Sequence, residues 1–290
     1  MKQLTREQRC AIVRCLVDGV SIRATTRITG FAKDTIQKLT RDLGEAVLEF
    51  QRNAMRNLVC KRVQVDEIWC FCYAKDKNLP NNMRDYPGVG SMWTWTAMCA
   101  DTKLVFAWTL GSRDADTAKD FMQDVQSRLA NRIQLSSDGY GVYLEAVERA
   151  FGSEVDYAML VKQFGKPNDK NPETRYSPGI CTGAKKTHVA GDPDPAYIST
   201  SFAERQNLNI RMQNRRYTRL TNAFSKKSEM LAYSIAITFM YHNFVRIHQT
   251  LKSTPAMKAG VATRKWDIED MVDLLPELKY NTRPKKAAGD

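Results

Sequence analysis

The run Val63-Gln64-Val65-Asp66-Glu67-Ile68-Trp69-Cys70-Phe71-Cys72-Tyr73 is rich in β-branched, aromatic and other apolar residues. This composition predicts a β-strand that begins near Arg62. Asp66 lies within it, and a carboxylate among strand residues is costly to bury unless it is paired or binds a cation. Asp66 is therefore a candidate functional residue. The alternative is that Asp66 or its neighbour Glu67 is an ordinary exposed strand residue.

The residues after this strand predict an alternation of strands and helices. Hydrophobic periodicity and turn residues place the elements as follows: a loop at Lys75–Gly90, strands at Met92–Ala100 and Leu104–Leu110, a helix at Thr117–Leu129, a strand at Arg132–Ser136, a helix at Tyr140–Phe151, a strand at Val155–Val161, a long polar loop at Gly165–Tyr197, a helix capped by Ser201, and an apolar helix at Glu229–Val245. This order matches an α/β fold of the ribonuclease H-like type, a mixed sheet with flanking helices.

The residues before the strand predict three helices. Thr5 and Gln8 have the spacing of a capping box, and Gly19 ends the first helix. Ser21 can cap a second helix, Gly30 makes a turn, and a third helix runs from about Ala32 to Leu43. This arrangement predicts a helix-turn-helix. The side chains expected to contact bases and phosphates are Lys33, Thr35, Gln37, Lys38 and Arg41. The alternative is a plain three-helix bundle with a solvated polar face.

We therefore expect four segments. Residues 1–45 form an all-α helix-turn-helix DNA-binding domain, and residues 46–61 form a linker in which the helical pattern continues. Residues 62–260 form the ribonuclease H-like catalytic domain, and residues 261–290 form a C-terminal tail that is basic from Thr282 onward.

The composition indicates a polyanionic partner. The formal net charge is +12 and the isoelectric point is near 9.4, which is typical of nucleic-acid-binding proteins but also fits a merely basic, soluble protein. The seven cysteines are scattered without zinc-type spacing, which favours reduced thiols in a cytoplasmic compartment. No signal peptide is expected, and the longest apolar run, Met230–Tyr241, is too short to span a membrane.

Three acids occupy particular places in the predicted order of elements. Asp66 lies in the first strand, Asp138 follows the fourth strand, and Glu204 lies in the first turn of a helix. In a ribonuclease H-like sheet the first strand adjoins the fourth, so the two aspartates can converge and Glu204 can approach from its helix. Carboxylate oxygens suit Mg²⁺ or Mn²⁺. Two such ions can activate a hydroxyl and stabilise the leaving oxygen of a phosphodiester. Alternatively, Asp138 is a turn residue and Glu204 an ordinary helix N-terminal acid.

The Glu204 helix and the segment after it are strongly basic. Residues 205–227 contain seven basic residues and no acid. Asn207 and Arg211 share a helix face with Glu204 because they lie three and seven residues further on. The side chains expected to contact DNA here are Asn207, Arg211, Arg215, Arg216 and Arg219. A solvated basic face is the alternative.

Several motifs resemble a known family. The blocks are Val65-Asp66-Glu67-Ile68-Trp69, Ser137-Asp138-Gly139-Tyr140, residues 199–208 around Glu204, residues 215–227, and residues 241–257. Together they resemble the acidic blocks of DDE transposases, and most of all those of the bacterial insertion-sequence-one family. The likeness covers about Arg62 to Gly260.

The resemblance implies a catalytic triad of Asp66, Asp138 and Glu204 that binds Mg²⁺ (or Mn²⁺) as two ions. It also implies DNA cleavage and strand transfer at the terminal inverted repeats of an insertion sequence and at target DNA, by a homo-oligomer in a bacterial cytoplasm. Family members usually carry a cysteine zinc motif before the helix-turn-helix. This chain has none, since Cys10 and Cys15 have no second pair nearby.

Two other functions remain open at the level of sequence. A hydrolytic nuclease of the same fold would share the carboxylates. A transcription regulator would share the helix-turn-helix but would need no three convergent acids. Nucleoside-triphosphate chemistry is not indicated, because Gly139-Tyr140-Gly141 is too short for a phosphate-binding loop and lacks the following lysine.

Overall fold

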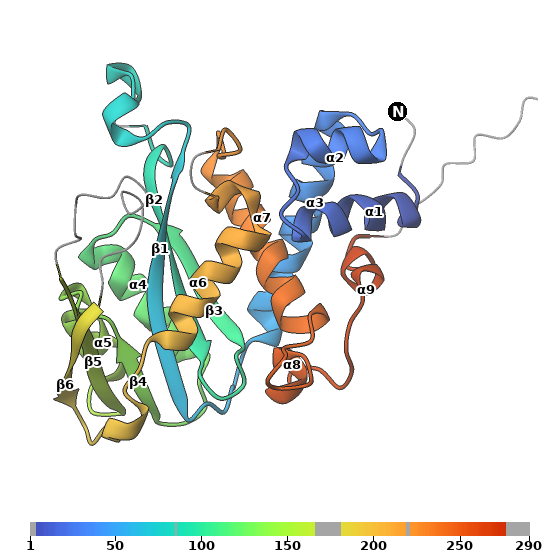
Figure 1. The fold of residues 1–290 in the computed structure, drawn as a ribbon. Helices are drawn as coiled ribbons and strands as arrows, with labels where there is room; N and C mark the ends of the chain where they lie inside the picture. The colour runs from blue at the N-terminus through green and yellow to red at the C-terminus, as the bar shows by residue number, and fades with distance from the viewer. Residues whose placement is uncertain (1–3, 85, 166–180, 219–220, 277–290) are drawn as a thin grey trace, which may run out of the picture.

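The structure, a computed structural model, describes residues 4–84, 86–165, 181–218 and 221–276. A twisted six-stranded sheet forms one part of the molecule, with helices on both of its faces. The N-terminal helices lie beside the last helices of the chain (Figure 1). The expected α/β class is confirmed in this form.

The six strands are β1 (Arg62–Cys72), β2 (Gly90–Cys99), β3 (Val105–Gly111), β4 (Ile133–Ser137), β5 (Val155–Phe164) and β6 (Cys181–Ala190), in the order β3-β2-β1-β4-β5-β6. The pairs β1–β2, β2–β3 and β5–β6 are antiparallel, whereas β1–β4 and β4–β5 are parallel. The expected contact between the first and fourth strands is confirmed, with Gln64 opposite Ser136.

Strand β6 corrects the expectation of one long loop at Gly165–Tyr197. It pairs antiparallel with β5, with Val161 opposite Lys185. Most of its residues are exposed, so it lacks the apolar alternation by which a half-buried strand is recognised. Charged residues such as Lys185 and Lys186 are typical of an edge strand that must not pair with another molecule. The rest of the expected loop includes residues 166–180, which lie outside the described residues.

Helices cover the two faces of the sheet. Helices α4 (Ala115–Ser127) and α5 (Val142–Phe151) lie on one face, and α6 (Ser201–Gln213) crosses the other (Figure 1). On the first face Trp95 packs against Phe121 and Tyr143. On the second face Ile68 belongs to a cluster with Ile210. Short 3₁₀ turns occur at Asp76–Asn78, Asn81–Met83, Pro195–Tyr197 and Arg215–Tyr217.

The N-terminal helices are α1 (Arg6–Val17), α2 (Ile22–Thr29) and α3 (Lys33–Ala54). The Thr5–Gln8 capping box and the Ser21 cap are confirmed. Gly30 adopts a left-handed conformation with φ of 75°, which favours glycine over other residues.

Helix α3 does not end at Leu43 as expected but continues to Ala54 through most of the expected linker. Its continuation packs on α7 (Ser228–Met240): Gly44 lies against Tyr233, and Gln51 Nε2 donates a hydrogen bond of 3.0 Å to the Ala236 carbonyl. Buried Val47 extends the apolar face of the helix. Tertiary burial therefore lengthens the helix.

The end of the chain also departs from the expected layout. Helix α7 stops at Met240, and the expected continuation to Val245 is a π-helical turn at Tyr241–Val245. Two short helices follow, α8 (Pro255–Lys258) and α9 (Ile268–Val272).

Part of the expected tail is folded structure. Arg6 and Asp273 form an ion pair of 2.6 Å that joins α1 to the residues after α9, and Met271 is buried. Residues 277–290 lie outside the described residues. The division into domains stays a prediction. No helix in the described parts of the chain is long and apolar enough to cross a membrane.

Candidate active site

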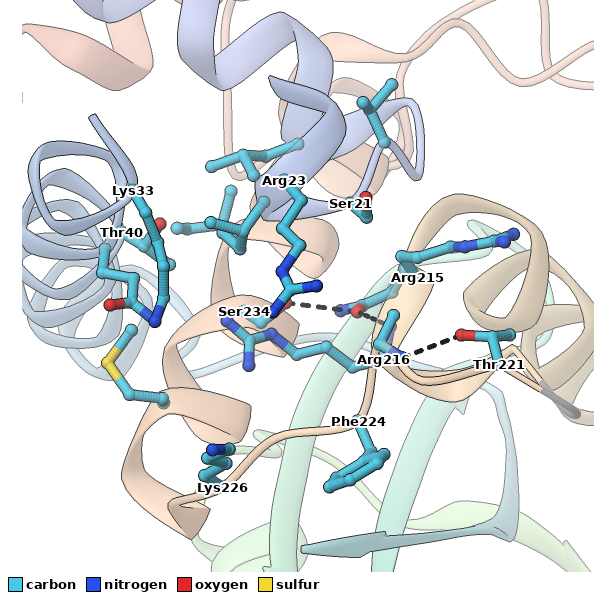
Figure 2. A pocket seen from close by; sticks show the side chains of 18 of the residues that line it. Ser21, Arg23, Lys33, Thr40, Arg215, Arg216, Thr221, Phe224, Lys226 and Ser234 are labelled. Carbon is cyan, nitrogen blue, oxygen red and sulfur yellow. Dashed lines mark hydrogen bonds between the residues drawn. The ribbon is translucent and has the colours of Figure 1, made fainter. Parts of the chain in front are cut away.

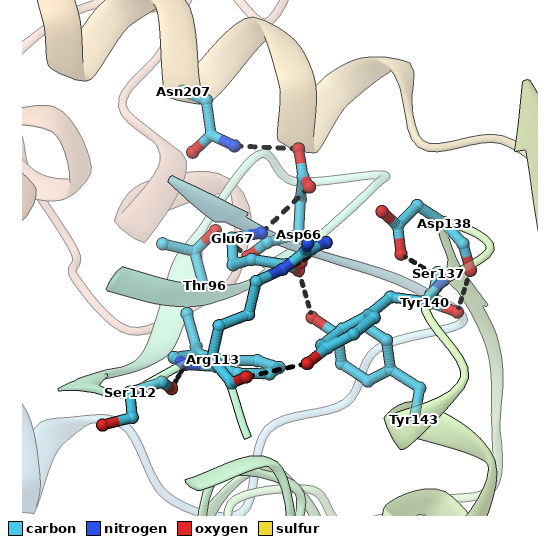
Figure 3. A network of polar contacts seen from close by, with 11 residues as sticks. Asp66, Glu67, Thr96, Ser112, Arg113, Ser137, Asp138, Tyr140, Tyr143 and Asn207 are labelled. Atoms are coloured by element: carbon cyan, nitrogen blue, oxygen red, sulfur yellow. Dashed lines mark hydrogen bonds and ion pairs between the residues drawn. The ribbon is translucent and has the colours of Figure 1, made fainter. Parts of the chain in front are cut away.

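Strands β1 and β4 place Asp66 and Asp138 side by side. The parallel register sets Gln64 opposite Ser136, and each aspartate lies two residues beyond that pair, Asp66 within β1 and Asp138 directly after β4. One carboxylate oxygen from each of Asp66, Glu67 and Asp138 lies within 4.8 Å of the other two (Figure 3). The structure thus brings together two of the three acids singled out in the sequence, and adds Glu67.

The Asp66 carboxylate is partly buried and has no cationic partner among the described residues. Its Oδ1 accepts a hydrogen bond from the Glu67 backbone N–H (2.9 Å), and its Oδ2 accepts one from Asn207 Nδ2 (2.8 Å). Burial, followed by the negative charge of Glu67, raises the pKa of Asp66 to about 7. A nearby cation would stabilise the ionised form of a carboxylate whose pKa is raised in this way.

Asp138 is held by the turn that follows β4. Its Oδ1 accepts a hydrogen bond of 2.9 Å from the Tyr140 backbone N–H, which fixes the side chain over the turn. The preceding Ser137 is fully buried, and its hydroxyl lies 2.7 Å from that of Tyr157. The turn thus fixes the Asp138 carboxylate, and the buried end of β4 fixes the backbone that precedes it.

Glu67 is a site residue that the sequence did not single out. Its side chain is only 2% exposed and pairs with Arg113 (2.6 Å), and it accepts a hydrogen bond of 3.0 Å from the Tyr143 hydroxyl. Burial raises the pKa of Glu67, as does the charge of Asp138, and Arg113 opposes this rise. The guanidinium of Arg113 lies 4.0 Å from the centre of the Tyr140 ring. The only signal in the sequence was a second acid directly beside Asp66.

Glu204 lies in the first turn of α6 and is not part of the three-carboxylate group. Its two carboxylate oxygens each accept a hydrogen bond of 2.5 Å from Lys162 Nζ, and Oε1 accepts another of 2.6 Å from Thr200 Oγ1. Its charge still reaches Asp66, whose pKa it helps to raise. Lys162 was missed because β5 was expected to end at Val161.

Strand β1 also sets the position of the Glu204 helix. Ser201 was expected to cap this helix, but Thr200 occupies the N-cap position, and its side chain accepts no hydrogen bond from the backbone of the helix. Gln64 Oε1 instead accepts hydrogen bonds from the backbone N–H groups of Phe202 (2.9 Å) and Ala203 (3.1 Å). A side chain two residues before Asp66 thus anchors the start of the helix that carries Glu204.

The residues expected to contact DNA are found in different surroundings. Asn207 bonds Asp66, and Arg211 donates a hydrogen bond of 3.3 Å to the Tyr217 carbonyl. Lys38 pairs with Asp42 on its own helix, and Thr35 is partly buried. Five of the residues expected to contact DNA line one shared cavity: Lys33, Gln37, Arg41, Arg215 and Arg216. Arg219 lies outside the described residues.

The donor set fits a hard divalent cation. Asp66, Glu67 and Asp138 offer only oxygen atoms, which Mg²⁺ and Mn²⁺ prefer. Burial and, after it, the charges of neighbouring carboxylates raise the pKa of Asp66, and a bound cation would stabilise its ionised form. With phosphate as the other ligand, such a site is suited to phosphodiester chemistry.

No protein-family model matches the chain, and no curated protein matches it in sequence. Among solved structures, the piggyBac transposase synaptic complex with hairpin DNA matches 94% of this chain and 71% of that chain, with a TM-score of 0.39 and 12% identity. The Mos1 transposase paired-end complex with left transposon end matches 53% of this chain and 60% of that one, with a TM-score of 0.20 and 10% identity.

The Mos1 strand transfer complex covers 82% of this chain and 78% of that chain, with a TM-score of 0.23 and 10% identity. These structures are transposases, but TM-scores and identities this low carry no argument about the fold or activity of the present chain. The function therefore has to be argued from the site itself.

Proposed function

We propose that the chain is a DDE-type DNA transposase that uses divalent metal ions to cut and join DNA. The observation that carries the proposal is the convergence of Asp66, within β1, and Asp138, directly after the neighbouring parallel strand β4, with Asp66 held at a raised pKa. The strand order around β1 is the one expected for a ribonuclease H-like core. The net charge of +12 favours DNA as the substrate.

Each site residue then has a defined task. Asp66 and Asp138 would hold the metal, Mg²⁺ or Mn²⁺, with Glu204 as the third carboxylate of a two-ion site. When bound, the ions would supply activation of the attacking hydroxyl and stabilisation of the leaving oxygen. Asn207 orients Asp66 through its 2.8 Å hydrogen bond. Lys162 holds Glu204 through an ion pair that metal binding would have to replace.

The finer assignment follows the motifs. We propose that the protein belongs to an insertion sequence of the insertion-sequence-one type and acts in a bacterial cytoplasm. It would bind the terminal inverted repeats through the helix-turn-helix of α1–α3 and act on target DNA as a homo-oligomer. A pair of inverted repeats flanking the gene would support this assignment.

Asp66→Asn and Asp138→Asn test the proposed activity. Each variant keeps the side-chain volume but removes the charge that holds the metal, so we expect loss of Mg²⁺-dependent cleavage with DNA binding largely intact. The measurement is cleavage of labelled DNA in Mg²⁺ and in Mn²⁺, with gel-shift binding as the control. Near wild-type nicking by either variant would show that the site is assigned wrongly.

Strand joining separates the transposase from a hydrolytic nuclease. A pre-cut DNA end with a free 3′-hydroxyl should be joined to a target duplex by the wild-type protein and not by Asp66→Asn. Hydrolysis without joining would favour the nuclease. DNA binding with neither reaction would favour a transcription regulator.

A further inference from the structure

A basic cavity lies between the N-terminal helices and the segment that links α6 to α7. It has a volume of about 840 Å³; α2 and α3 form one wall, and residues from 214–216 and 221–238 form the other (Figure 2). None of its lining residues is acidic. Its cationic lining residues are Arg23, Lys33, Arg41, Arg215, Arg216, Lys226 and Lys227.

Among the described residues, no carboxylate forms an ion pair with these cations. Arg216 is partly buried, and its Nη1 donates a hydrogen bond of 2.5 Å to the neutral Ser225 hydroxyl. Burial lowers the pKa of Arg216, which reports a cation held away from water. Like charges gathered in a hollow and left unpaired indicate an anionic ligand.

The cavity joins two segments that lie far apart in the sequence. Lys33, Gln37 and Arg41 are spaced four residues apart on α3 and line the cavity, whereas Thr35 and Lys38 of the expected recognition face do not. The opposite wall carries Arg215 and Arg216. Beside the cavity the turn before α2 lies close to α6, because a Cβ added at Gly19 would lie 2.6 Å from the Met212 carbonyl oxygen.

Helix α6 connects the cavity to the carboxylates. Glu204 lies in its first turn, and Asn214, directly after its last turn, lines the cavity. Ten residues of helix span about 15 Å. A nucleic-acid strand in the cavity could therefore extend to the acids within less than one turn of DNA, which is about 34 Å.

We propose that this cavity binds the phosphate backbone of a single DNA strand close to the strand end on which the carboxylates act. Its volume is that of a small-ligand site, whereas a duplex has a major groove that is itself about 12 Å wide. A few nucleotides of one strand fit these dimensions, and cations without acids suit phosphates rather than bases. The identity of the ligand as DNA rests on the proposed function.

The test compares two double variants with the same change in net charge. Arg23→Ala with Lys226→Ala removes one cation from each wall of the cavity. Arg27→Ala with Lys185→Ala removes two exposed cations that do not line it. All four side chains are exposed, so both variants should fold, which circular dichroism and thermal melting would check. Binding of a labelled ten-nucleotide single strand is measured by fluorescence anisotropy over a range of salt concentrations, without metal.

We expect the cavity variant to lose roughly tenfold in affinity and its salt slope to fall by roughly 1.4, the value for two phosphate contacts on a single strand. The control variant should change much less. Equal losses in both variants would overturn the proposal, because the charge would then act without a defined site. Loss of duplex binding alone would also overturn it, as would displacement of the strand by micromolar inorganic tripolyphosphate, which would indicate a small-polyanion site.

This outcome can be separated from that of the proposed function. The binding assay needs neither metal nor cleavage, so strand binding that depends on the cavity would stand even if Asp66→Asn kept its activity. Conversely, metal-dependent cleavage together with strand binding that is unchanged in the cavity variant would overturn only the present inference.

Discussion

Glu67 and Glu204 are rival third carboxylates, and their surroundings differ. The side chain of Glu204 is 41% exposed and pairs with Lys162, whereas that of Glu67 is 2% exposed and pairs with Arg113. A buried acid fixed by an arginine and a tyrosine acts mainly on structure. A half-exposed acid can exchange its lysine for a metal ion at lower cost.

We therefore expect Glu204→Gln to abolish cleavage with little change in melting. Glu67→Gln should lower stability by about 2–4 kcal/mol, because it leaves Arg113 unpaired beside the site. Cleavage rate per folded molecule, heat of Mn²⁺ binding and melting temperature distinguish the two. If Glu204→Gln cleaved DNA fully and Glu67→Gln were stable but inactive, Glu67 rather than Glu204 would be the third metal-binding carboxylate.

His242 gives the protein a defined pH dependence. Its side chain is buried, Nε2 lies 3.0 Å from the Lys103 carbonyl, and burial lowers its pKa to about 4. The nearby charges of His248 and Arg246 contribute to this lowering of the pKa. Between pH 6.5 and 4 the unfolded chain binds a proton that the folded protein does not, so stability falls as the pH falls.

This loss should reach about 3 kcal/mol by pH 4. Urea unfolding at pH 7.5, 6 and 5 measures it. His242→Gln should be less stable at neutral pH but lose most of this slope, while His188→Gln, on exposed β6, should keep it. An unchanged slope in His242→Gln would show that other groups cause the acid sensitivity, with His248 the first to examine because burial lowers its pKa as well.

At the scale of elements, the placement of α6 on β1 controls the site. Gln64 is 3% exposed and accepts hydrogen bonds from two N–H groups at the start of α6. At the edge of the sheet, the Asn243 side chain also bonds backbone groups: its Oδ1 accepts a hydrogen bond from the Val105 N–H (3.0 Å) and its Nδ2 donates one to the Val105 carbonyl (2.7 Å). The motif around Asn243 thus ties the end of α7 to β3.

Gln64→Ala should cost about 1–3 kcal/mol, because it leaves two helix N–H groups without an acceptor. The same loss should weaken the contact of Asn207 with Asp66 and reduce cleavage in the folded variant. Chemical denaturation and single-turnover cleavage measure the two effects. Gln123→Ala, at an exposed position of α4, is the control, and equal behaviour of the two variants would contradict a positioning role for Gln64.

At the scale of the whole molecule, the N-terminal helices and the sheet share one hydrophobic core. Buried residues of α1 and α3 belong to the same cluster as those of β1, α4, α5 and α9. The contact of α3 with α7 is close, since a Cβ at Gly44 would lie 2.3 Å from the Tyr233 Cβ. We therefore expect the described chain to unfold as one unit.

Gly44→Ala tests this expectation. Alanine usually stabilises a helix interior by up to about 1 kcal/mol, but here we expect a loss of about 1–3 kcal/mol from the clash with Tyr233. Calorimetry should show a single unfolding transition whose midpoint temperature falls in the variant. Gly141→Ala, which meets no atom within 4 Å, is the control. Two transitions of which only one moves would show that the N-terminal helices fold separately.

Local patterns were enough to predict most elements and one side of the site. The contact of Asp66 with Asp138 was expected from the order of the elements, because the first strand adjoins the fourth in a ribonuclease H-like sheet. The apolar run around Asp66 and the caps at Thr5 and Ser21 follow from periodicity and turn chemistry, which act over a few residues. These features would be expected in any chain with the same local sequence.

Only the tertiary structure decided the partners of the charged side chains and the limits of several elements. The pairing of Glu204 with Lys162 and of Glu67 with Arg113, the extent of α3 and the presence of β6 depend on contacts between residues far apart in the chain. The same holds for the basic cavity, whose two walls lie almost two hundred residues apart. Burial and electrostatic compensation are properties of the assembled molecule, and no local pattern encodes them.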